Sequence, residues 1–239
     1  MSAGVPDRQR CQTRTESERR LGGSCGGLES GAPSQNAEMS RHRSSKQEPE
    51  AAPDAWRRVA EIEKELLQWP TWSSVAAQER ADSTDELSTS AADTVYVRIP
   101  LGETCGPGLE GVFLRLNALA YRREFNVTAT LEFPGGRSWI TIARVDGWPS
   151  APHVNIRARG HPALRRLPAM VEGHHVHRFA DNARLGRSAF EPPQNLPVAV
   201  PVNESIQSFR DFLRIVAKEF HIAPELDRFD SPDSWELLI

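Results

Sequence analysis

The amino-acid sequence predicts an α+β fold: a small antiparallel sheet of about five to six strands, covered by a C-terminal helix and preceded by an N-terminal helix and a disordered tail. Three observations lead to this prediction. Apolar and polar side chains alternate over several short stretches between residues 94 and 180, as in strands with one buried face. Apolar residues recur at helical spacing on either side of this region. The first 52 residues hold almost no large apolar groups.

Residues 1–52 form the predicted tail. They are rich in Ser, Gly, Gln, Glu and Arg, and a chain of this composition cannot bury enough apolar surface to offset the entropy that ordering costs. We therefore expect this stretch to be disordered. Met39 lies within it, so Met1 and Met39 are both candidates for the first residue of the natural chain.

Residues 53–93 are predicted to form an amphipathic helix followed by a linker. Asp54 is a candidate N-cap, and Pro70 should end the helix. Between them, apolar residues recur at spacings of three and four: Trp56, Val59, Ile62 and Leu66. Residues 73–93 carry many Ser, Thr and Asp and few large apolar groups, which is typical of a linker.

Residues 94–224 are predicted to form the α+β domain. Alternating apolar positions indicate four strands in succession, near residues 95–99, 112–116, 125–133 and 138–146. The sequence Pro134-Gly135-Gly136 favours a turn between the third and the fourth strand. These strands should therefore follow one another as antiparallel neighbours.

Two further strands are predicted from the same alternation. Residues 153–159 would place Val154, Ile156 and Ala158 on the buried face, and residues 174–180 would place His175, His177 and Phe179 together on one face. Asn203 is predicted to cap a final helix that covers the sheet. Its apolar side consists of Ile206, Phe209, Leu213, Val216 and Phe220.

The last segment, residues 225–239, is an acidic C-terminal tail with an apolar end. Trp235 and residues 237–239 are large apolar groups that either pack back on the domain or bind a partner.

Charge and cysteine usage narrow the classes of function. The formal net charge is -3, so the whole molecule does not attract nucleic acid, and any phosphate binding requires a local cluster of arginines. Three cysteines without C-x-x-C spacing fit a reducing compartment, and we expect a cytoplasmic protein. No apolar run approaches the length of a membrane span, so we expect no membrane partner.

Residues 139–181 concentrate the side chains that could carry chemistry. Five of the seven histidines lie there: His153, His161, His174, His175 and His177. His175 and His177 are two residues apart, so on a strand both imidazoles project from one face, roughly 6 to 7 Å apart. Imidazole titrates near neutral pH, so such a pair can act as general base and general acid.

Cleavage of RNA without a metal ion or other cofactor is the first functional hypothesis. His175 and His177 would form the acid/base pair, and His153 and Asp146 would orient them. Arginines would stabilise the charge that builds on the phosphate. The candidates for this phosphate-binding role are Arg144, Arg157 and Arg178.

Two alternatives remain open. The H-x-H pair, a further histidine and either Asp146 or Asp181 would make a ligand set for zinc, iron or nickel. The stretch GHHVHRFAD at 173–181 resembles the metal-binding strand of cupins, although those proteins have Glu where this chain has Asp181. The second alternative is a binding or regulatory module without enzymatic activity, whose histidines only form a polar strand face.

The order of features in the domain resembles a known family. Arg144-Val145-Asp146 is followed by Pro152-His153, by Asn155, by the cluster His174 to His177 and by a closing amphipathic helix. Over roughly residues 94–222 this order is similar to that of TumE-type toxins, which are small proteins of bacterial toxin–antitoxin pairs with relatives in mobile elements. The resemblance implies a small sheet with a covering helix, an antitoxin as partner and ribonuclease activity on RNA.

Overall fold

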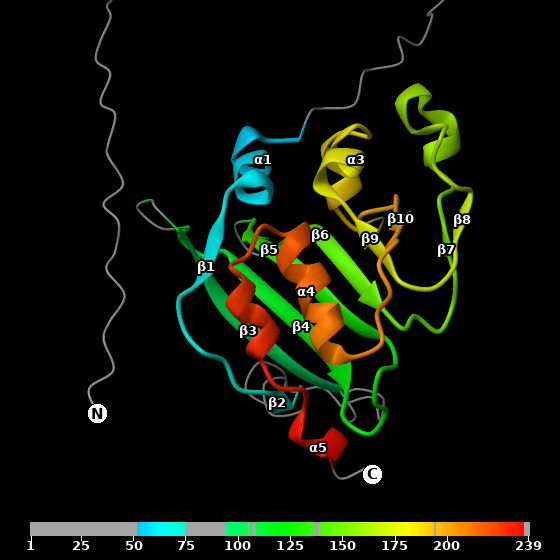
Figure 1. Cartoon of the computed structure of the whole chain (residues 1–239). Coiled ribbons are helices and arrows are strands. Elements are labelled where there is room, and N and C mark those ends of the chain that lie inside the picture. Colours follow the sequence, from blue (N-terminus) through cyan, green and yellow to red (C-terminus); the bar gives the residue numbers. More distant parts are fainter. Residues whose placement is uncertain are drawn as a thin grey trace, which may run out of the picture. The chain divides into compact units, whose positions relative to one another are not determined.

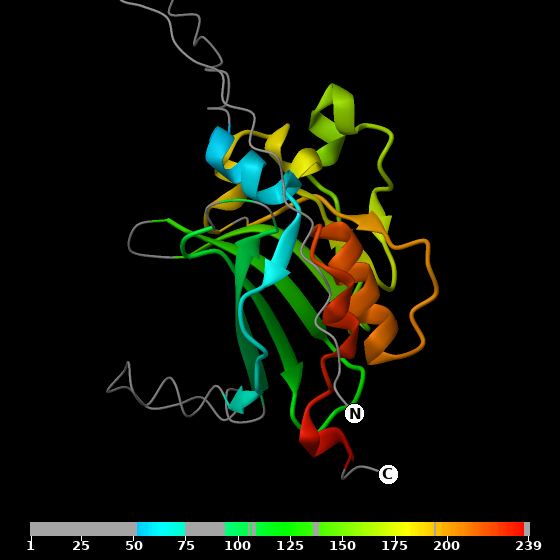
Figure 2. The same ribbon diagram turned by 60° about the vertical axis from the view of Figure 1, so that its left-hand side comes forward.

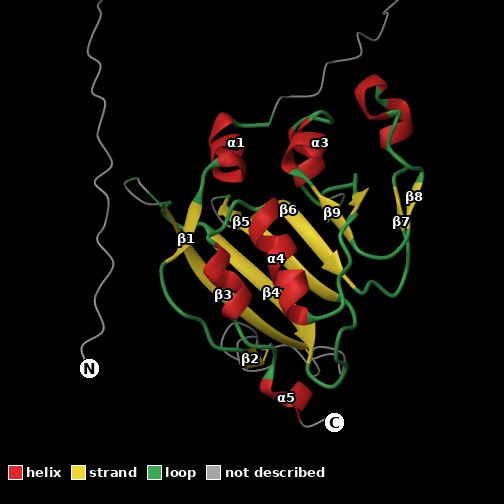
Figure 3. Ribbon diagram, in the orientation of Figure 1, coloured by secondary structure: helices red, strands yellow, loops and turns green. Residues whose placement is uncertain are grey.

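A computed structural model describes six ranges of the chain: residues 52–74, 94–104, 106, 109–135, 139–193 and 195–236. The predicted tail therefore lies outside the described residues, apart from the buried Ala52, and so do most of the predicted linker and, in the predicted Pro134-Gly135-Gly136 turn, Gly136. The described residues have the predicted α+β fold, with one main antiparallel sheet and several helices (Figures 1 and 3).

The main sheet has the strand order β1-β3-β4-β5-β6-β9-β10, and β2 pairs with β3 beside this path. Its strands are β1 (Lys64–Leu66), β2 (Ser73–Ser74), β3 (Thr94–Glu103), β4 (Phe113–Leu119), β5 (Val127–Pro134), β6 (Trp139–Gly147), β9 (His175–His177) and β10 (Val200–Pro201). A separate two-stranded sheet joins β7 (His153–Val154) to β8 (Met170–Val171). The predicted succession of four antiparallel neighbours, β3 to β6, is confirmed.

The helices are α1 (Asp54–Glu61), α3 (Phe179–Ala183), α4 (Phe209–Glu219) and α5 (Asp233–Glu236), with short 3-10 helices η1 (Ala158–Gly160), η2 (Pro162–Leu164), η3 (Arg187–Phe190) and η4 (Pro224–Arg228). Helix α4 lies across one face of the main sheet in both views of the molecule (Figures 1 and 2). Its buried side faces the apolar side chains of the strands. The predicted covering role of the C-terminal helix is confirmed.

The two faces of the main sheet differ in chemistry. Val145 and Val176 are register partners on the face toward α4, where both belong to the hydrophobic core with Phe212. Because side chains alternate along a strand, the neighbours of these valines point to the opposite face. One register row on that opposite face runs across five strands and is polar throughout: Arg98, Arg115, Thr130, Arg144 and His177.

The N-terminal helix is shorter than predicted. It ends at Glu61, and the next residue, Ile62, is extended with φ -75° and ψ 148°. The chain then forms β1, because Lys64 turns inward and donates hydrogen bonds from Nζ to two backbone carbonyls, those of Ile62 and Phe220, each at 2.7 Å. Pro53, rather than the predicted Asp54, occupies the N-cap position, and no side chain caps this helix.

Two of the predicted central strands are also shorter. The fifth ends after Val154, because the side chain of Asn155 binds the backbone of Pro168 and Ala199 and the chain then enters η1. Ile156, predicted to be buried, is 75% exposed. The sixth strand ends at His177, and Phe179 begins α3 instead of sharing a face with the histidines.

The C-terminal region follows the predicted apolar pattern, with a different helix start. Ser208, not Asn203, caps α4, and its side chain accepts a hydrogen bond from the backbone N–H of Asp211. Trp235 packs back on the domain, is 2% exposed and donates from Nε1 to the Leu119 carbonyl at 2.7 Å. Residues 237–239 lie outside the described residues. Among the residues that the structure describes, no helix is both long and apolar enough to cross a membrane.

Candidate metal centre

Strands β6 and β9 place four polar side chains side by side on the sheet face opposite α4. Arg144 is the register partner of His177, and Asp146 is the register partner of His175. Residues two apart on a strand share a face, so the two pairs form a square of side chains. His175 is 3% exposed and His177 is fully buried. The prediction that these histidines share a face is confirmed.

The Asp146 carboxylate is the anionic centre of this square. Its Oδ2 atom lies 3.1 Å from Nε2 of His175 and 3.1 Å from Nε2 of His177. Arg144 donates from Nε to the same Oδ2 at 2.9 Å, and Thr128 on β5 donates its hydroxyl to Oδ1 at 3.2 Å. The carboxylate is therefore held from three strands.

His153 reaches the cluster from β7, outside the main sheet. Its ring centroid is 4.6 Å from that of His177 and 5.5 Å from that of His175. One ring nitrogen from each of the three histidines can be chosen so that all three atoms lie within 4.8 Å of one another. The structure thus brings together all four residues that the sequence hypothesis assigned to catalysis.

Backbone carbonyls fix the proton on each imidazole. His175 and His177 each donate from Nδ1, to the carbonyls of Gly173 (2.8 Å) and Leu196 (2.7 Å). His153 donates from Nε2 to the Pro197 carbonyl at 3.2 Å. A carbonyl only accepts, so in each neutral ring the other nitrogen carries a lone pair. For His175 and His177 that nitrogen is Nε2, which lies 3.1 Å from Asp146 Oδ2, so either ring hydrogen-bonds to this carboxylate only when its Nε2 also carries a proton.

Two buried asparagines hold the segment that carries these carbonyls. Asn155 pairs with the backbone N–H and carbonyl of Ala199, each at 2.8 Å. Asn182 pairs with the backbone N–H and carbonyl of Val198 at 3.0 and 2.9 Å. Both side chains are fully buried. They therefore fix residues 198–199, directly after the carbonyls that orient His177 and His153.

Burial and charge set the protonation of the cluster. Burial alone would raise the pKa of Asp146, but the close contacts of its carboxylate with His175 and His177 and the nearby charge of Arg144 outweigh this effect and hold the pKa far below its ordinary value. Burial lowers the pKa of His177 to about 4, and its bond with Asp146 offsets only part of that effect. Burial also lowers the pKa of His153. An anionic carboxylate and neutral imidazoles are the forms in which these groups bind metal ions.

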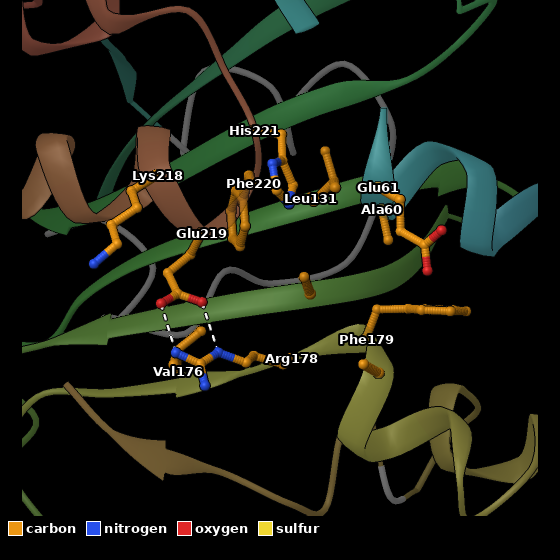
Figure 4. Close-up of a pocket in the computed structure, with 12 residues that line it drawn as sticks. Ala60, Glu61, Leu131, Val176, Arg178, Phe179, Lys218, Glu219, Phe220 and His221 are labelled. Atoms are coloured by element: carbon orange, nitrogen blue, oxygen red, sulfur yellow. Dashed lines mark hydrogen bonds and ion pairs between the residues drawn. The ribbon is translucent and has the colours of Figure 1, made fainter. Parts of the chain in front are cut away.

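The three predicted phosphate-binding arginines do not come together. Arg144 lies in the cluster, whereas Arg157 is exposed at the start of η1. Arg178 lies toward α4 and donates two hydrogen bonds of 2.7 Å to Glu219. It lines a cavity of about 380 Å³ together with Val176 and Phe179 (Figure 4). This cavity opens on the face of β9 opposite His175 and His177.

Other candidates from the sequence also lie outside the cluster. Asp181 is in the first turn of α3, close enough to Arg178 to raise its pKa. His174 accepts at Nδ1 from the backbone N–H of Trp148 at 3.0 Å, and His161 precedes η2. In the described part of the chain, the one group of three or more potential ligands found consists of His153, His175 and His177.

Sequence reasoning missed the supporting residues. Thr128 could have been found once β5 and β6 were aligned, because it is the register partner of Asp146. Asn182 carries no such signal, because its partner Val198 lies 16 residues away in an irregular segment.

We compared the chain with known protein families, curated proteins and solved structures. No family model, no curated protein and no solved structure matches the chain.

Proposed function

We propose that His153, His175, His177 and Asp146 bind a divalent transition metal ion, and that metal binding is the function of this site. The observation that carries the proposal is the convergence of three imidazoles, each of which also has one ring nitrogen bonded to a backbone carbonyl. Metal-binding histidines almost always have such a partner on the other ring nitrogen, because it fixes the tautomer and the ring orientation.

The distances fit the coordination of zinc and similar ions. Bonds of 2.0–2.1 Å in a tetrahedron place ligand atoms about 3.3 Å apart. Asp146 Oδ2 is already 3.1 Å from two imidazole nitrogens. The three histidine nitrogens, which lie within 4.8 Å of one another, would move closer together by on the order of 1 Å to complete the set. Imidazole and carboxylate ligands together suit Zn²⁺, Fe²⁺, Co²⁺ and Ni²⁺.

Metal content and spectroscopic titration test this function. The wild-type chain should carry close to one transition metal ion after purification, or bind one Co²⁺ with the visible absorption of a protein-bound ion. A His175→Ala, His177→Ala double variant should lose this binding. His221→Ala is the matched control, because the His221 side chain is 46% exposed and lies far along the chain from the cluster. Equal binding by wild type and double variant would refute the proposal.

Metal-free cleavage of RNA by His175 and His177 is the second candidate. The contact of both imidazoles with Asp146 and of His177 with Arg144 favours it, since an acid/base pair beside a cation suits phosphate chemistry. The burial of both rings makes it the weaker candidate. RNA cleavage that persists in EDTA and disappears in the double variant would establish it. The toxin–antitoxin assignment stays a prediction, which growth arrest on expression of wild type but not of the double variant would support.

A further inference from the structure

The guanidinium of Arg144 lies where a metal ion would have to bind. Arg144 Nη2 is 2.6 Å from His177 Nε2, and Arg144 Nε is 2.9 Å from Asp146 Oδ2. Because the Nδ1 proton of His177 points to the Leu196 carbonyl, the Nε2 lone pair accepts the hydrogen bond from Arg144. Arg144 thus uses one lone pair from each of two proposed metal ligands.

A metal ion and this guanidinium exclude each other at His177. The ion would stand about 2.0–2.1 Å from Nε2 along the direction of its lone pair. Arg144 Nη2 is 2.6 Å from the same atom, so both cannot occupy that direction. The charges of the ion and the guanidinium also repel at such a distance. Metal binding therefore requires Arg144 to release His177.

We expect the released side chain to stay on the polar face of the sheet. Arg144 is 26% exposed, and its register neighbours on that face are Thr130 and then Arg115. Its five N–H donors would stand beside the bound ion. A cation with a planar fork of donors next to a metal ion is suited to an oxyanion, which can bind the ion through one oxygen and the arginine through others.

Building on the metal site proposed above, we propose that Arg144 is a displaceable plug: in the metal-free protein it caps His177 and Asp146, and on metal loading it becomes the receptor for an oxyanion ligand of the ion. The ligand class is a phosphate or a carboxylate group. The polar row that continues from Arg144 to Arg115 and Arg98 lies on the same face, away from α4, so the anion would approach the site from the side of this row.

Metal affinity tests the first half of this proposal. Co²⁺ titration of Arg144→Gln should give an affinity at least about tenfold higher than that of wild type, because the competitor for His177 and Asp146 is gone. Arg115→Gln is the matched control: it removes the same charge from the same register row, and its side chain is 37% exposed. It should leave the affinity within about twofold of wild type. Equal affinities in both variants and wild type would refute the claim that Arg144 competes with the ion, and would leave the proposed metal site unaffected.

Anion binding tests the second half. Inorganic phosphate, and in a separate arm acetate, is titrated into the Co²⁺-loaded proteins while the visible spectrum is followed. The wild-type spectrum should shift with at least one of these anions, and Arg144→Gln should need about tenfold more of it. A response to phosphate alone assigns a phosphate ligand, and a response to acetate alone assigns a carboxylate.

Three outcomes would contradict the inference in distinguishable ways. Loss of Co²⁺ binding in wild type and Arg144→Gln alike would refute the proposed metal site itself. Tight Co²⁺ binding with no anion response would refute the receptor role. An equal anion response in wild type and Arg144→Gln would show that the ion alone holds the anion, and would likewise refute that role.

Discussion

Asp146 is the residue on which the cluster depends most. Its Oδ2 contacts both buried imidazoles and the Arg144 guanidinium, while Oδ1 is held by Thr128. Its low pKa keeps the carboxylate ionised in neutral solution. It therefore supplies the negative charge that a divalent ion needs next to three imidazole ligands.

Asp146→Asn should lower the affinity for Co²⁺ or Zn²⁺ by at least about 100-fold, because loss of a supporting partner alone typically costs about 10- to 100-fold and Asp146 is a proposed ligand. Glu219→Gln is a close control, since the Glu219 side chain is also 14% exposed and also pairs with an arginine, on the opposite face. Competition titration against a chromophoric chelator measures both. If the Asp146→Asn variant bound the ion with wild-type affinity, the Asp146 carboxylate would not be a metal ligand.

Lys64 gives the fold a pH dependence that is independent of the histidines. Its burial lowers its pKa from 10.5 to about 8, although Glu63 opposes the shift. Below pH 8 the amine is charged in both the folded and the unfolded chain, and the full cost of burying the charge is present. Between pH 8 and 10.5 the folded state loses the proton first, so the stability contributed by Lys64 rises with pH. The shift corresponds to about 3 kcal/mol.

Urea unfolding at pH 7.5, 9 and 10.5 should show this rise in wild type relative to Lys64→Met. The comparison cancels the titration of the tyrosines and cysteines, which both proteins share. The variant leaves the carbonyls of Ile62 and Phe220 without their lysine donor, so it should be the less stable protein at every pH. The difference between the two free energies of unfolding should widen toward pH 10.5. A difference that does not change with pH would contradict the assignment.

At the scale of elements, the segment between η3 and β10 connects the histidines to the rest of the domain. The carbonyls of Leu196 and Pro197 orient two of the rings, and Asn155 and Asn182 hold the next two residues. The orientation of these rings therefore depends on the hydrogen bonds of Asn155 and Asn182, which contact none of the proposed ligands.

Asn182→Ala should lower both metal affinity and stability. It leaves the N–H and carbonyl of Val198 unpaired in the interior, which costs at least about 2 kcal/mol. Because residues 196–197 then lose their anchor, metal affinity should fall about 10- to 100-fold. Trp235→Phe is the control for stability alone, since it removes a buried hydrogen bond to Leu119 at a distance from the histidines. If both variants bound metal equally well, the positioning role would be refuted.

The elements that the sequence predicted well are those whose pattern is local. Strands β3 to β6 show clear alternation, and the apolar stripe of α4 is regular. The prediction of the N-terminal helix failed because the structure there depends on one side chain that breaks the pattern. Ile62 and Leu66 continue the helical spacing, but Lys64 points inward and draws its segment into β1.

The candidate site shows the same division between local and distant information. The shared face of His175 and His177 follows from their spacing alone. The meeting of Asp146 with His175 follows only from the pairing of β6 with β9, and that of His153 with His177 from the path of the loop after β6. Arg178 was predicted beside the histidines, but it directly follows His177, so it points to the opposite face, where it pairs with Glu219.

For the whole molecule, the two faces of the main sheet carry different kinds of side chain. One face carries the core beneath α4, and the other carries the polar row that ends at the histidine cluster. The proposed ligands and their supporting carbonyls come from β6, β7, β9 and the segment before β10, so they span residues 146 to 197. An ion bound there would connect parts of the chain that are distant in sequence.

Metal binding should therefore stabilise the entire domain and not only the two-stranded sheet that carries His153. An ion that binds only the folded state at a free concentration of 100 times its dissociation constant adds about 2.7 kcal/mol to the free energy of unfolding. For a domain of this size, the Tm should rise by about 5 to 10 °C. Differential scanning fluorimetry with Zn²⁺ and with EDTA measures the shift, and His177→Ala should abolish it because that variant removes a proposed ligand on β9. A shift of the same size in His177→Ala would place the bound ion elsewhere on the chain, because His177 is the residue through which the ion would join β9 to the carbonyl of Leu196.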